Sequence, residues 1–277
     1  MIRLGLIGDN IKQSQSPALH RLAGGLTGLP VSYELLIPAE QGRDFEALLS
    51  WAEAEGFQGL NITYPYKERV VTKLDVPEAA VRALGACNTV IFGEGTPRGH
   101  NTDYSGFRAA FAARFGDETP GRVAMAGAGG VGKAVAFGLA DLGAAELGIF
   151  DTDVARAQAL AAALSRYKPQ MDVRVATSIA DACEGTDGLV NSTPLGMGGI
   201  GGTAFATDLL AGRKWAFDAV YTPVDTPFLT DAAQAGIAVL TGYELFFHQG
   251  VDAFRLFTGA EVDPQALRVA LQGQAAA

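Results

Sequence analysis

The sequence predicts an α/β protein whose strands form parallel sheets. Short apolar runs alternate with amphipathic helical patterns almost from end to end, and this alternation is typical of βαβ units. A glycine-rich turn at residues 127–132 stands between one such strand and the next helix. The polar, turn-rich stretch at residues 116–121 interrupts the alternation just before a fresh strand, which predicts a domain boundary near it.

The first elements carry clear start and stop signals. Residues 2–7 form an apolar run that ends in Gly8, Asp9 and Asn10, as a strand does before a turn. Ser16 then looks like a helix N-cap and Pro17 like the proline of a first helical turn, so we expect a helix from there to about residue 27. A strand at residues 33–37 and an amphipathic helix at residues 43–55 follow.

The next strand ends close to a lysine. Residues 59–62 are apolar enough for a buried strand, and Pro65 ends it because proline cannot donate to a sheet ladder. Lys67 opens a helical pattern that runs to residue 84 with one proline break. Asn61 and Thr63 point to the same side of an extended backbone, where both can hydrogen-bond to a polyol. A lone lysine after a proline turn is more often a surface residue, so a catalytic role depends on the rest of the chain.

The alternation continues to the end of the chain. The further expected strands cover residues 86–92, 98–101, 123–126, 146–150, 172–175, 188–191, 215–218 and 237–240. The further expected helices cover residues 104–115, 133–142, 153–166, 179–183 and 226–235, and a final helix from near Gly242 carries Gln249 among apolar positions.

The composition limits the classes of partner. With 277 residues, 48% hydrophobic and 18% charged, the chain is long enough for two globular domains. Its net charge of −9 argues against nucleic acid and against an anionic membrane as partners, because both would be repelled. We therefore expect a small-molecule ligand, and an anionic one must be held by local donors.

The cysteines and histidines give no sign of a metal site. Cys87 and Cys183 lack metal-binding spacing, and so few cysteines in a long chain indicate a reducing compartment. His20, His100 and His248 are far apart, so packing or surface roles are expected for them. The amino-terminal residues do not resemble a signal peptide, and no apolar run approaches the ~18 residues of a membrane span, so we expect a cytoplasmic protein.

The turn at residues 127–132 has the pattern G-x-G-x-x-G in the context of a dinucleotide-binding unit. Its glycines allow close backbone approach to a pyrophosphate, and the helix that follows supplies N–H groups and the positive end of its dipole. The second strand ends at Asp151, 24 residues after Gly127, where a carboxylate binds ribose hydroxyls and repels a 2′-phosphate. Asp153 adds to that repulsion, so the pattern favours NAD over NADP, and Arg156 is the feature that opposes this preference.

A second loop follows the strand at residues 188–191. Residues 191–197 read N-S-T-P-L-G-M and are followed by several glycines. A polar, glycine-rich loop at the carboxyl end of a strand is where a nicotinamide would be gripped. A mobile surface loop has the same composition, and the two interpretations have equal weight.

Several motifs together resemble the shikimate dehydrogenase family. Residues 14–20 are similar to the family's S-x-S-P-x-x-H, and residues 61–67 are similar to its N-x-T-x-P-x-K. Residues 85–89 resemble G-A-x-N-T, and residues 99–106 resemble G-x-N-T-D-x-x-G. The remaining blocks, in family order, are 127–132, 191–197, 218–221 and 249–250.

This resemblance implies a fold and a set of site residues. The expected domains are an α/β substrate domain with a mixed sheet, residues 1–103 with 242–277, and a Rossmann-type NAD-binding domain, residues 104–241. Lys67 and Asp103 would form the catalytic pair, and Ser14 and Ser16 would bind the substrate carboxylate. The other implied substrate-binding residues are Asn61, Thr63, Asn88, Tyr221 and Gln249. The implied cofactor-binding residues are Gly127, Gly129, Gly130, Val131, Gly132, Asp151, Thr193, Pro194, Gly196, Met197 and Gly242.

One departure from the family is informative. NADP-using relatives typically follow the second dinucleotide strand with Asn-Arg-Thr, whereas residues 151–153 here read D-T-D. The phosphate-binding arginine is absent from its usual place. This pattern, with residues 64–67 and 253–259, resembles the NAD-dependent quinate/shikimate dehydrogenase branch.

The resemblance implies reversible hydride transfer between NAD and C3 of shikimate or quinate, with Lys67 and Asp103 handling the hydroxyl proton. Three alternatives stay open: an NADP-dependent biosynthetic shikimate dehydrogenase, a paralogue of the same fold acting on another acid, and a non-catalytic NAD-binding sensor. The sequence fixes neither the choice between quinate and shikimate nor that between monomer and homodimer.

Overall fold

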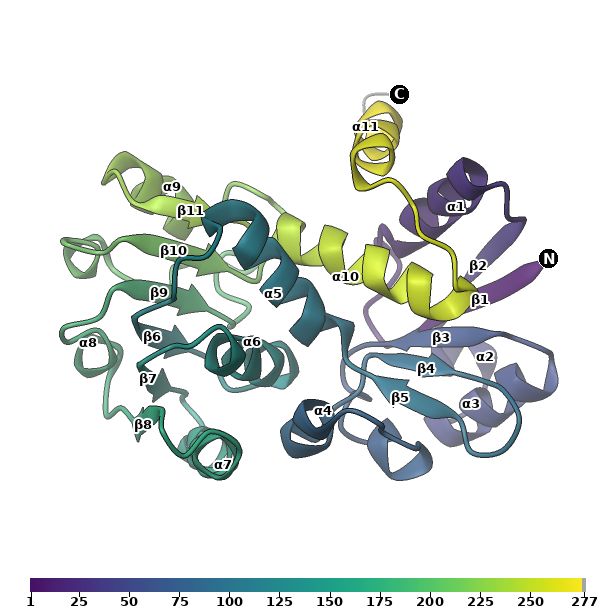
Figure 1. Ribbon diagram of the computed structural model, residues 1–277, viewed down its shortest axis with the longest axis horizontal. Coiled ribbons are helices and arrows are strands. Elements are labelled where there is room, and N and C mark those ends of the chain that lie inside the picture. Colours follow the sequence, from purple (N-terminus) through teal and green to yellow (C-terminus); the bar gives the residue numbers. More distant parts are fainter. Residues whose placement is uncertain (276–277) are drawn as a thin grey trace. The chain divides into compact units, whose positions relative to one another are not determined.

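The computed structural model describes residues 1–275 and divides into two units. The first unit contains Met1–Thr102 and the segment from Gln249 onward, and the second contains Asp103–His248. The chain passes between the units within helix α5 (Thr102–Phe115) and returns within helix α10 (Gly242–Thr258) (Figure 1). Residues 116–121 lie inside the second unit, so the boundary expected near them is wrong. Within residues 1–275, no helix is both long and apolar enough to cross a membrane.

The first unit contains a five-stranded mixed sheet. Its strands are β1 (Ile2–Ile7), β2 (Val31–Leu36), β3 (Gly59–Ile62), β4 (Thr89–Ile91) and β5 (Arg98–His100). They lie in the order β2-β1-β3-β4-β5 (Figure 1). The first three are parallel, and β4 and β5 are antiparallel to their neighbours. The mixed sheet expected for this part of the chain is confirmed.

The helices of the first unit correct two expectations. They are α1 (Ser16–Thr27), α2 (Pro38–Gln41), α3 (Phe45–Ala54), the 3₁₀ helix η1 (Val70–Lys73), α4 (Ala79–Leu84), α11 (Pro264–Ala275) and the second part of α10. Ser16 is the first helical residue and not the N-cap, which is Gln15. The helical pattern expected from Lys67 to residue 84 with a break at Pro77 is found only as η1 and α4, and the interruption is longer than expected because Asp75 pairs with Arg98 and draws the chain into an extended conformation between them.

A close approach explains the glycine at the start of β3. A Cβ on Gly59 would lie 2.4 Å from the ring of Phe257, which α10 packs against the sheet. Phe257 belongs to a buried apolar cluster with Leu4, Leu6 and Tyr33. This core fixes β1 and β3 side by side, so the residues that follow their carboxyl ends are held close together.

The second unit contains a six-stranded parallel sheet. Its strands are β6 (Arg122–Ala126), β7 (Glu146–Phe150), β8 (Asp172–Val175), β9 (Gly188–Asn191), β10 (Trp215–Asp218) and β11 (Ala238–Leu240). Their order is β11-β10-β9-β6-β7-β8 (Figure 1). The direction of winding reverses between β6 and β9, and ligands of such sheets bind at the carboxyl ends of the strands beside this reversal. The expected Rossmann-type fold is confirmed.

The helices of the second unit, besides α5 and the start of α10, cover the connections between strands. They are α6 (Gly130–Asp141), α7 (Val154–Tyr167), α8 (Ile179–Ala182), the 3₁₀ helix η2 (Thr207–Leu209) and α9 (Pro227–Gln234). Helix α6 begins three residues earlier than expected, so its first turn contains Gly130 and Gly132.

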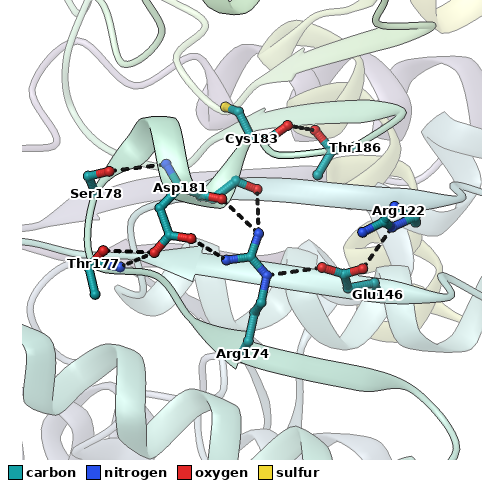
Figure 2. Close-up of polar contacts among 9 residues, drawn as sticks. Arg122, Glu146, Arg174, Thr177, Ser178, Asp181, Cys183 and Thr186 are labelled. Atoms are coloured by element: carbon teal, nitrogen blue, oxygen red, sulfur yellow. Dashed lines mark hydrogen bonds and ion pairs between the residues drawn. The ribbon is translucent and has the colours of Figure 1, made fainter.

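A charged network lies at the amino ends of β6 and β7. Figure 2 shows Arg174 between Asp181 and Glu146. Its Nη1 donates to Asp181 Oδ1 at 2.9 Å, its Nε donates to Glu146 Oε1 at 3.0 Å, and its Nη2 donates to the carbonyl of Asp181 at 2.7 Å. Arg122 Nε donates to the other oxygen of Glu146 at 2.7 Å. These contacts tie β6, β7, β8 and α8 together at the end of the sheet opposite the ligand-binding edge.

Arg174→Met is expected to lower the melting temperature by about 2–4 °C, because it removes four hydrogen bonds, one of them to the carbonyl of Ala182, and leaves two carboxylates without their shared partner. Thermal unfolding followed by circular dichroism measures this change. The matched control is Arg166→Met on the exposed side of α7, which should leave the melting temperature unchanged. Equal melting temperatures for Arg174→Met and the parent would show that the network does not stabilise the unit.

The same network predicts a pH dependence of stability. A backbone hydrogen bond from Thr177, followed by its hydroxyl and by Arg174, lowers the pKa of Asp181. Burial opposes the shift at Glu146, but hydrogen bonds from Arg122 and Arg174 lower its pKa overall. Because both pKa values are lower when folded, the stabilisation is complete above the ordinary values of 3.8 and 4.5 and is lost as the pH falls through the lowered values.

Candidate active site

In the first unit, Lys67 lies in a turn that is fixed on both sides. The backbone N–H of Tyr66 donates to the carbonyl of Thr63 at 2.9 Å, and the N–H of Cys87 donates to the carbonyl of Lys67 at 2.8 Å. The hydroxyl of Tyr66 donates to Asp9 Oδ1 at 2.7 Å, and its ring stacks on Phe45. The half-buried lysine is therefore presented from a rigid corner after β3.

A buried hydrogen-bond network joins three of the predicted substrate-binding residues. Asn61 Nδ2 donates to Thr89 Oγ1 at 3.1 Å, and the hydroxyl of Thr89 lies 3.0 Å from Asn88 Oδ1. The backbone N–H of Thr102 donates to the same oxygen of Asn88 at 2.7 Å, and the hydroxyl of Thr102 lies 3.3 Å from Gln249 Oε1. Asn61, Asn88 and Gln249, from distant segments, are thus brought into one arrangement of amide groups.

Tyr33 connects this network to the serine pair. Its hydroxyl donates to Asn61 Oδ1 at 2.8 Å. Burial raises the pKa of Tyr33 well above its ordinary value, and a hydrogen bond with Ser16 partly opposes that shift. Ser14 Oγ donates to Ser16 Oγ at 3.1 Å and accepts from the backbone N–H of Ser16 at 3.2 Å. The two serines therefore lie together before α1, in contact with the amide network through Tyr33.

Thr63 and His20 lie beside this group in different ways. Thr63 is one residue beyond β3, and its methyl group packs so closely on Gly8 that a Cβ there would lie 2.3 Å away. His20 is buried and stacks on Tyr33 with ring centroids 4.7 Å apart. Burial lowers the pKa of His20 to about 3, against a hydrogen bond with Asn61 that raises it, so the imidazole is neutral at pH 7 and packs as a core residue.

In the second unit, the glycine turn makes a close backbone contact with the loop after β9. Gly127 has φ +95°, and a Cβ on it would lie 2.8 Å from the carbonyl carbon and oxygen of Ser192. A Cβ on Gly132 would lie 2.5 Å from the carbonyl oxygen of Gly127. Gly129 is the N-cap of α6 and offers no side-chain cap, so the first N–H groups of the helix, from Gly130 and Val131 on, suit an anion. The turn therefore fits the pyrophosphate of a dinucleotide.

Asp151 and Arg156 are both held by local contacts. Asp151 Oδ2 accepts from the N–H of Ala128 at 2.7 Å, which ties the carboxylate to the glycine turn. Arg156 Nε lies 3.3 Å from Asp153 Oδ2, and the arginine side chain is 65% exposed. The positive charge that could hold a 2′-phosphate is thus paired with an acidic neighbour.

The loop at residues 191–197 is held by its first residue. Asn191 Oδ1 accepts from the N–H and the hydroxyl of Thr193 at 2.9 and 2.7 Å, and Asn191 Nδ2 donates to the carbonyl of Leu195 at 3.1 Å. The N–H of Met197 donates to the carbonyl of Pro194 at 3.1 Å, and Gly196 supplies a positive φ of +90°. These bonds favour an ordered loop over a mobile one.

Asp103, the first residue of the second unit, affects Tyr221 electrostatically. Burial raises the pKa of Tyr221, and the negative charge of Asp103 adds to this shift. The ring of Tyr221 stacks on Phe246 at 5.3 Å. A Cβ on Gly242 would lie 2.5 Å from the carbonyl oxygen of Val220, so α10 begins directly against the segment that carries Tyr221.

The predicted residues therefore form two groups. Ser14, Ser16, Asn61, Asn88 and Gln249 are linked in the first unit by the contacts above. Lys67 belongs to the first unit and Asp103 to the second, so their pairing stays a prediction. Within the part of the chain that the structure describes, no group of three or more His, Cys, Asp or Glu side chains is arranged to hold a metal ion.

Sequence reasoning missed the residues that join the others. Tyr33, Thr89 and Thr102 connect the predicted residues, but none was assigned a role. The two threonines lie inside the motifs at residues 85–89 and 99–106, so the motifs contained the signal. Tyr33 lies in no motif, and its contact with Asn61 spans 28 positions of sequence.

Comparison with known proteins gives consistent results over almost the whole chain. A family model described as the shikimate dehydrogenase substrate binding domain matches residues 6–90. A quinate/shikimate dehydrogenase (NAD(+)) of Corynebacterium efficiens is 43% identical, with 96% of each chain covered. A shikimate dehydrogenase (NADP(+)) of an Arthrobacter species is 40% identical, covering 96% of this chain and 92% of the relative. The solved structure of quinate dehydrogenase from Corynebacterium glutamicum in complex with NAD matches with a TM-score of 0.90 and 39% identity, covering 98% of this chain and 99% of the other.

Proposed function

This chain belongs to the shikimate dehydrogenase family, and we propose that it is an NAD-dependent quinate/shikimate dehydrogenase. The reaction removes a hydride from C3 of shikimate or quinate and the proton of the hydroxyl on that carbon. The products are the 3-dehydro acid and reduced NAD. Bound NAD supplies the hydride acceptor, and the residues of the chain bind and orient the acid and move the proton.

The cofactor preference is carried by Asp151. Its carboxylate follows β7 and accepts the N–H of Ala128, so a negative charge lies against the glycine turn. A 2′-phosphate at this position would be repelled, whereas ribose hydroxyls would find an acceptor. Arg156, the candidate that sequence reasoning offered for holding the phosphate, lies beside the carboxylate of Asp153, which would also repel a 2′-phosphate.

The substrate is assigned to the network of the first unit. Amide groups of Asn61, Asn88 and Gln249 offer donors and acceptors for ring hydroxyls, and the hydroxyls of Ser14 and Ser16 offer donors for the carboxylate. We assign substrate binding to the first of the two expected domains, residues 1–103 with 242–277. We assign NAD binding to the second, residues 104–241. The substrate is a hydroxylated cyclohexane or cyclohexene carboxylate.

Proton transfer is assigned to Lys67 with Asp103. The group that takes the hydroxyl proton must lie within hydrogen-bond reach of that oxygen as the hydride leaves. We assign the transfer to the two residues together and not to either one alone. Tyr221, which interacts electrostatically with Asp103, is assigned to the substrate as well.

The free thiols and the cofactor bear on the compartment and on the direction of the reaction. Both cysteines are buried free thiols, which suits a reducing compartment, and we place the enzyme in the cytoplasm as a monomer or homodimer. NAD dependence favours the oxidative direction.

The test is a set of initial rates for shikimate and quinate, each with NAD and with NADP, followed by the absorbance of reduced nicotinamide. Turnover of both acids with NAD supports the proposal. Turnover of shikimate with NADP alone would identify an NADP-dependent biosynthetic enzyme. Failure with both acids would indicate a paralogue for another acid or, if NAD still binds, a non-catalytic sensor.

Asp151→Asn is expected to lower kcat/KM with NAD by about tenfold or more and to raise it with NADP, because a hydrogen bond to a charged group is lost and the repulsion of the 2′-phosphate is removed. The ratio of kcat/KM for the two cofactors measures the change. The control is Asp172→Asn, an exposed carboxylate at the start of β8, which should leave the ratio unaltered. An unchanged ratio in Asp151→Asn would remove this residue from cofactor selection.

A further inference from the structure

The carboxylate of Asp218 is fully buried at the carboxyl end of β10 and accepts three hydrogen bonds. Asn191 Nδ2 and the N–H of Val220 both donate to Oδ1 at 2.9 Å. The hydroxyl of Thr226 donates to Oδ2 at 2.7 Å. Burying a carboxylate costs free energy unless its oxygens are hydrogen-bonded. The three groups that donate to Asp218 should therefore show why an acidic residue stands at this position.

On one side, Asp218 fixes the orientation of the Asn191 amide. The two residues are partners in the register of β10 and β9. Because Nδ2 of Asn191 faces the carboxylate, its Oδ1 faces Thr193 and accepts both the N–H and the hydroxyl of that residue. If the amide turned over, its Nδ2 would meet the N–H of Thr193, donor against donor. The carboxylate therefore sets the conformation of the loop at residues 192–198.

On the other side, Asp218 fixes the segment that carries Tyr221. Val220 N–H and the Thr226 hydroxyl bind the carboxylate from either end of this segment. Thr226 is also the N-cap of α9, where its Oγ1 accepts from the N–H of Leu229 at 3.3 Å. The N–H of Gly198 donates to the carbonyl of Thr222 at 2.9 Å, so the two loops also bind each other.

The charge state agrees with this arrangement. Burial raises the pKa of Asp218 to about 6, while hydrogen bonds from Val220, Thr226 and Asn191 oppose the shift. The group is thus ionised at pH 7 and can accept from all three donors.

We propose that Asp218 is a positioning residue for hydride transfer, which holds the loop at residues 192–198 and the segment of Tyr221 in the one arrangement that accepts the nicotinamide ring and the substrate. This inference rests on the proposed function, which assigns Thr193, Pro194, Gly196 and Met197 to the cofactor. Asp218 lies beneath the loops and acts through Asn191, Val220 and Thr226.

The role can be separated from folding by comparing NAD with ADP-ribose, which lacks the nicotinamide ring. ADP-ribose should bind through the glycine turn and Asp151. Among the bonds described, Asp218 makes none to either of them. Asp218→Leu is expected to bind ADP-ribose within about twofold of the parent, to bind NAD more weakly and to lose about 10- to 100-fold in kcat, the range for lost hydrogen bonds to a charged group. Calorimetric binding of both ligands and steady-state kinetics measure these changes.

Two further variants complete the test. Asp218→Asn keeps an acceptor for Asn191 and Val220 and disturbs only the Thr226 side, so it should recover most of the activity lost in Asp218→Leu. Asp187→Asn is the matched control: Asp187 precedes β9 and binds the N–H of Arg122 and the amine of Lys214, each at 2.9 Å, at the other end of the same strands. It should leave both ligands and kcat unchanged.

Equal losses of ADP-ribose and NAD binding in Asp218→Leu, or normal kcat in it, would overturn the proposal. If Asp218→Leu does not fold, Asn191→Leu decides, because the proposed effect on the loop passes through the bonds of Asn191 to Asp218 and Thr193, and parental NAD affinity and kcat in that variant would overturn the proposal. If the parent enzyme turns over neither acid, the proposed function fails, but the comparison of NAD with ADP-ribose still reports on Asp218, because binding requires no turnover.

Discussion

Lys67→Ala is expected to lower kcat for quinate and shikimate by about 10²- to 10⁴-fold, the usual loss on removing a general acid/base, with only a modest loss of substrate affinity. The turn that carries Lys67 is held by backbone bonds to Thr63 and Cys87 and by the side chain of Tyr66. Truncation at Cβ therefore removes the amine and leaves the corner in place. Steady-state kinetics at saturating NAD, with equilibrium binding of each acid, measure the two effects separately.

The matched control is Lys73→Ala, which removes an exposed lysine from the end of η1, two residues before the chain pairs with β5. Lys73→Ala removes the same positive charge as Lys67→Ala and should retain the parental kcat. Near-normal turnover in Lys67→Ala would exclude this residue from proton transfer. An equal loss of kcat in both variants would indicate that the positive charge of this segment matters, and not proton transfer by Lys67.

Gly127→Ala is expected to lower kcat/KM with NAD by about 10²-fold or more. Two costs act together, because φ is +95° and the new Cβ would lie 2.8 Å from backbone atoms of Ser192. Neither the turn nor the loop after β9 can yield without moving the cofactor site, so the effect should fall on the KM for NAD and on ADP-ribose binding alike.

Gly236→Ala separates these costs, because Gly236 has a φ of +78° and nothing lies within 4 Å of its Cβ position. That variant should lose some stability but retain its KM for NAD. A parental KM for NAD in Gly127→Ala would show that the turn adapts, and the cofactor would then have to be assigned elsewhere.

The bounds of β7, β8, β9 and β10 could be predicted to the residue, those of β6 and β11 to within one residue, and those of several helices could not. Each of these four strands is a short run with apolar residues that lies between polar or glycine-rich segments. Helix α6 begins at Gly130, a residue of poor helix propensity, because its position is set by the close contact between Gly127 and Gly132. Pro77 indicated a break between η1 and α4, but the pairing of Asp75 with Arg98 of β5, which extends that break, has no local signal.

The residues of the candidate site could be predicted from the sequence, but the hydrogen bonds that connect them could not. The resemblance to the shikimate dehydrogenase family indicated Asn88 and Gln249, and it agreed with the extended segment that gave Asn61 a side chain suited to a polyol. The bonds that hold them come from Thr89 and Thr102, and Asp218 holds the loop at residues 192–198 through Asn191. Such roles depend on which strands become neighbours, so they appear only once the sheet order is known.

The separation of the two groups of residues has an evolutionary consequence. The amide network lies wholly in residues of the first unit, while Asp151, to which we assign cofactor selection, lies in the second and touches only its own turn and Asp153 among the bonds described. If these assignments hold, substitutions at residues 151–153 would change which nicotinamide cofactor the enzyme uses while the residues assigned to the acid stay the same. Cofactor choice and substrate recognition could then change independently within one gene.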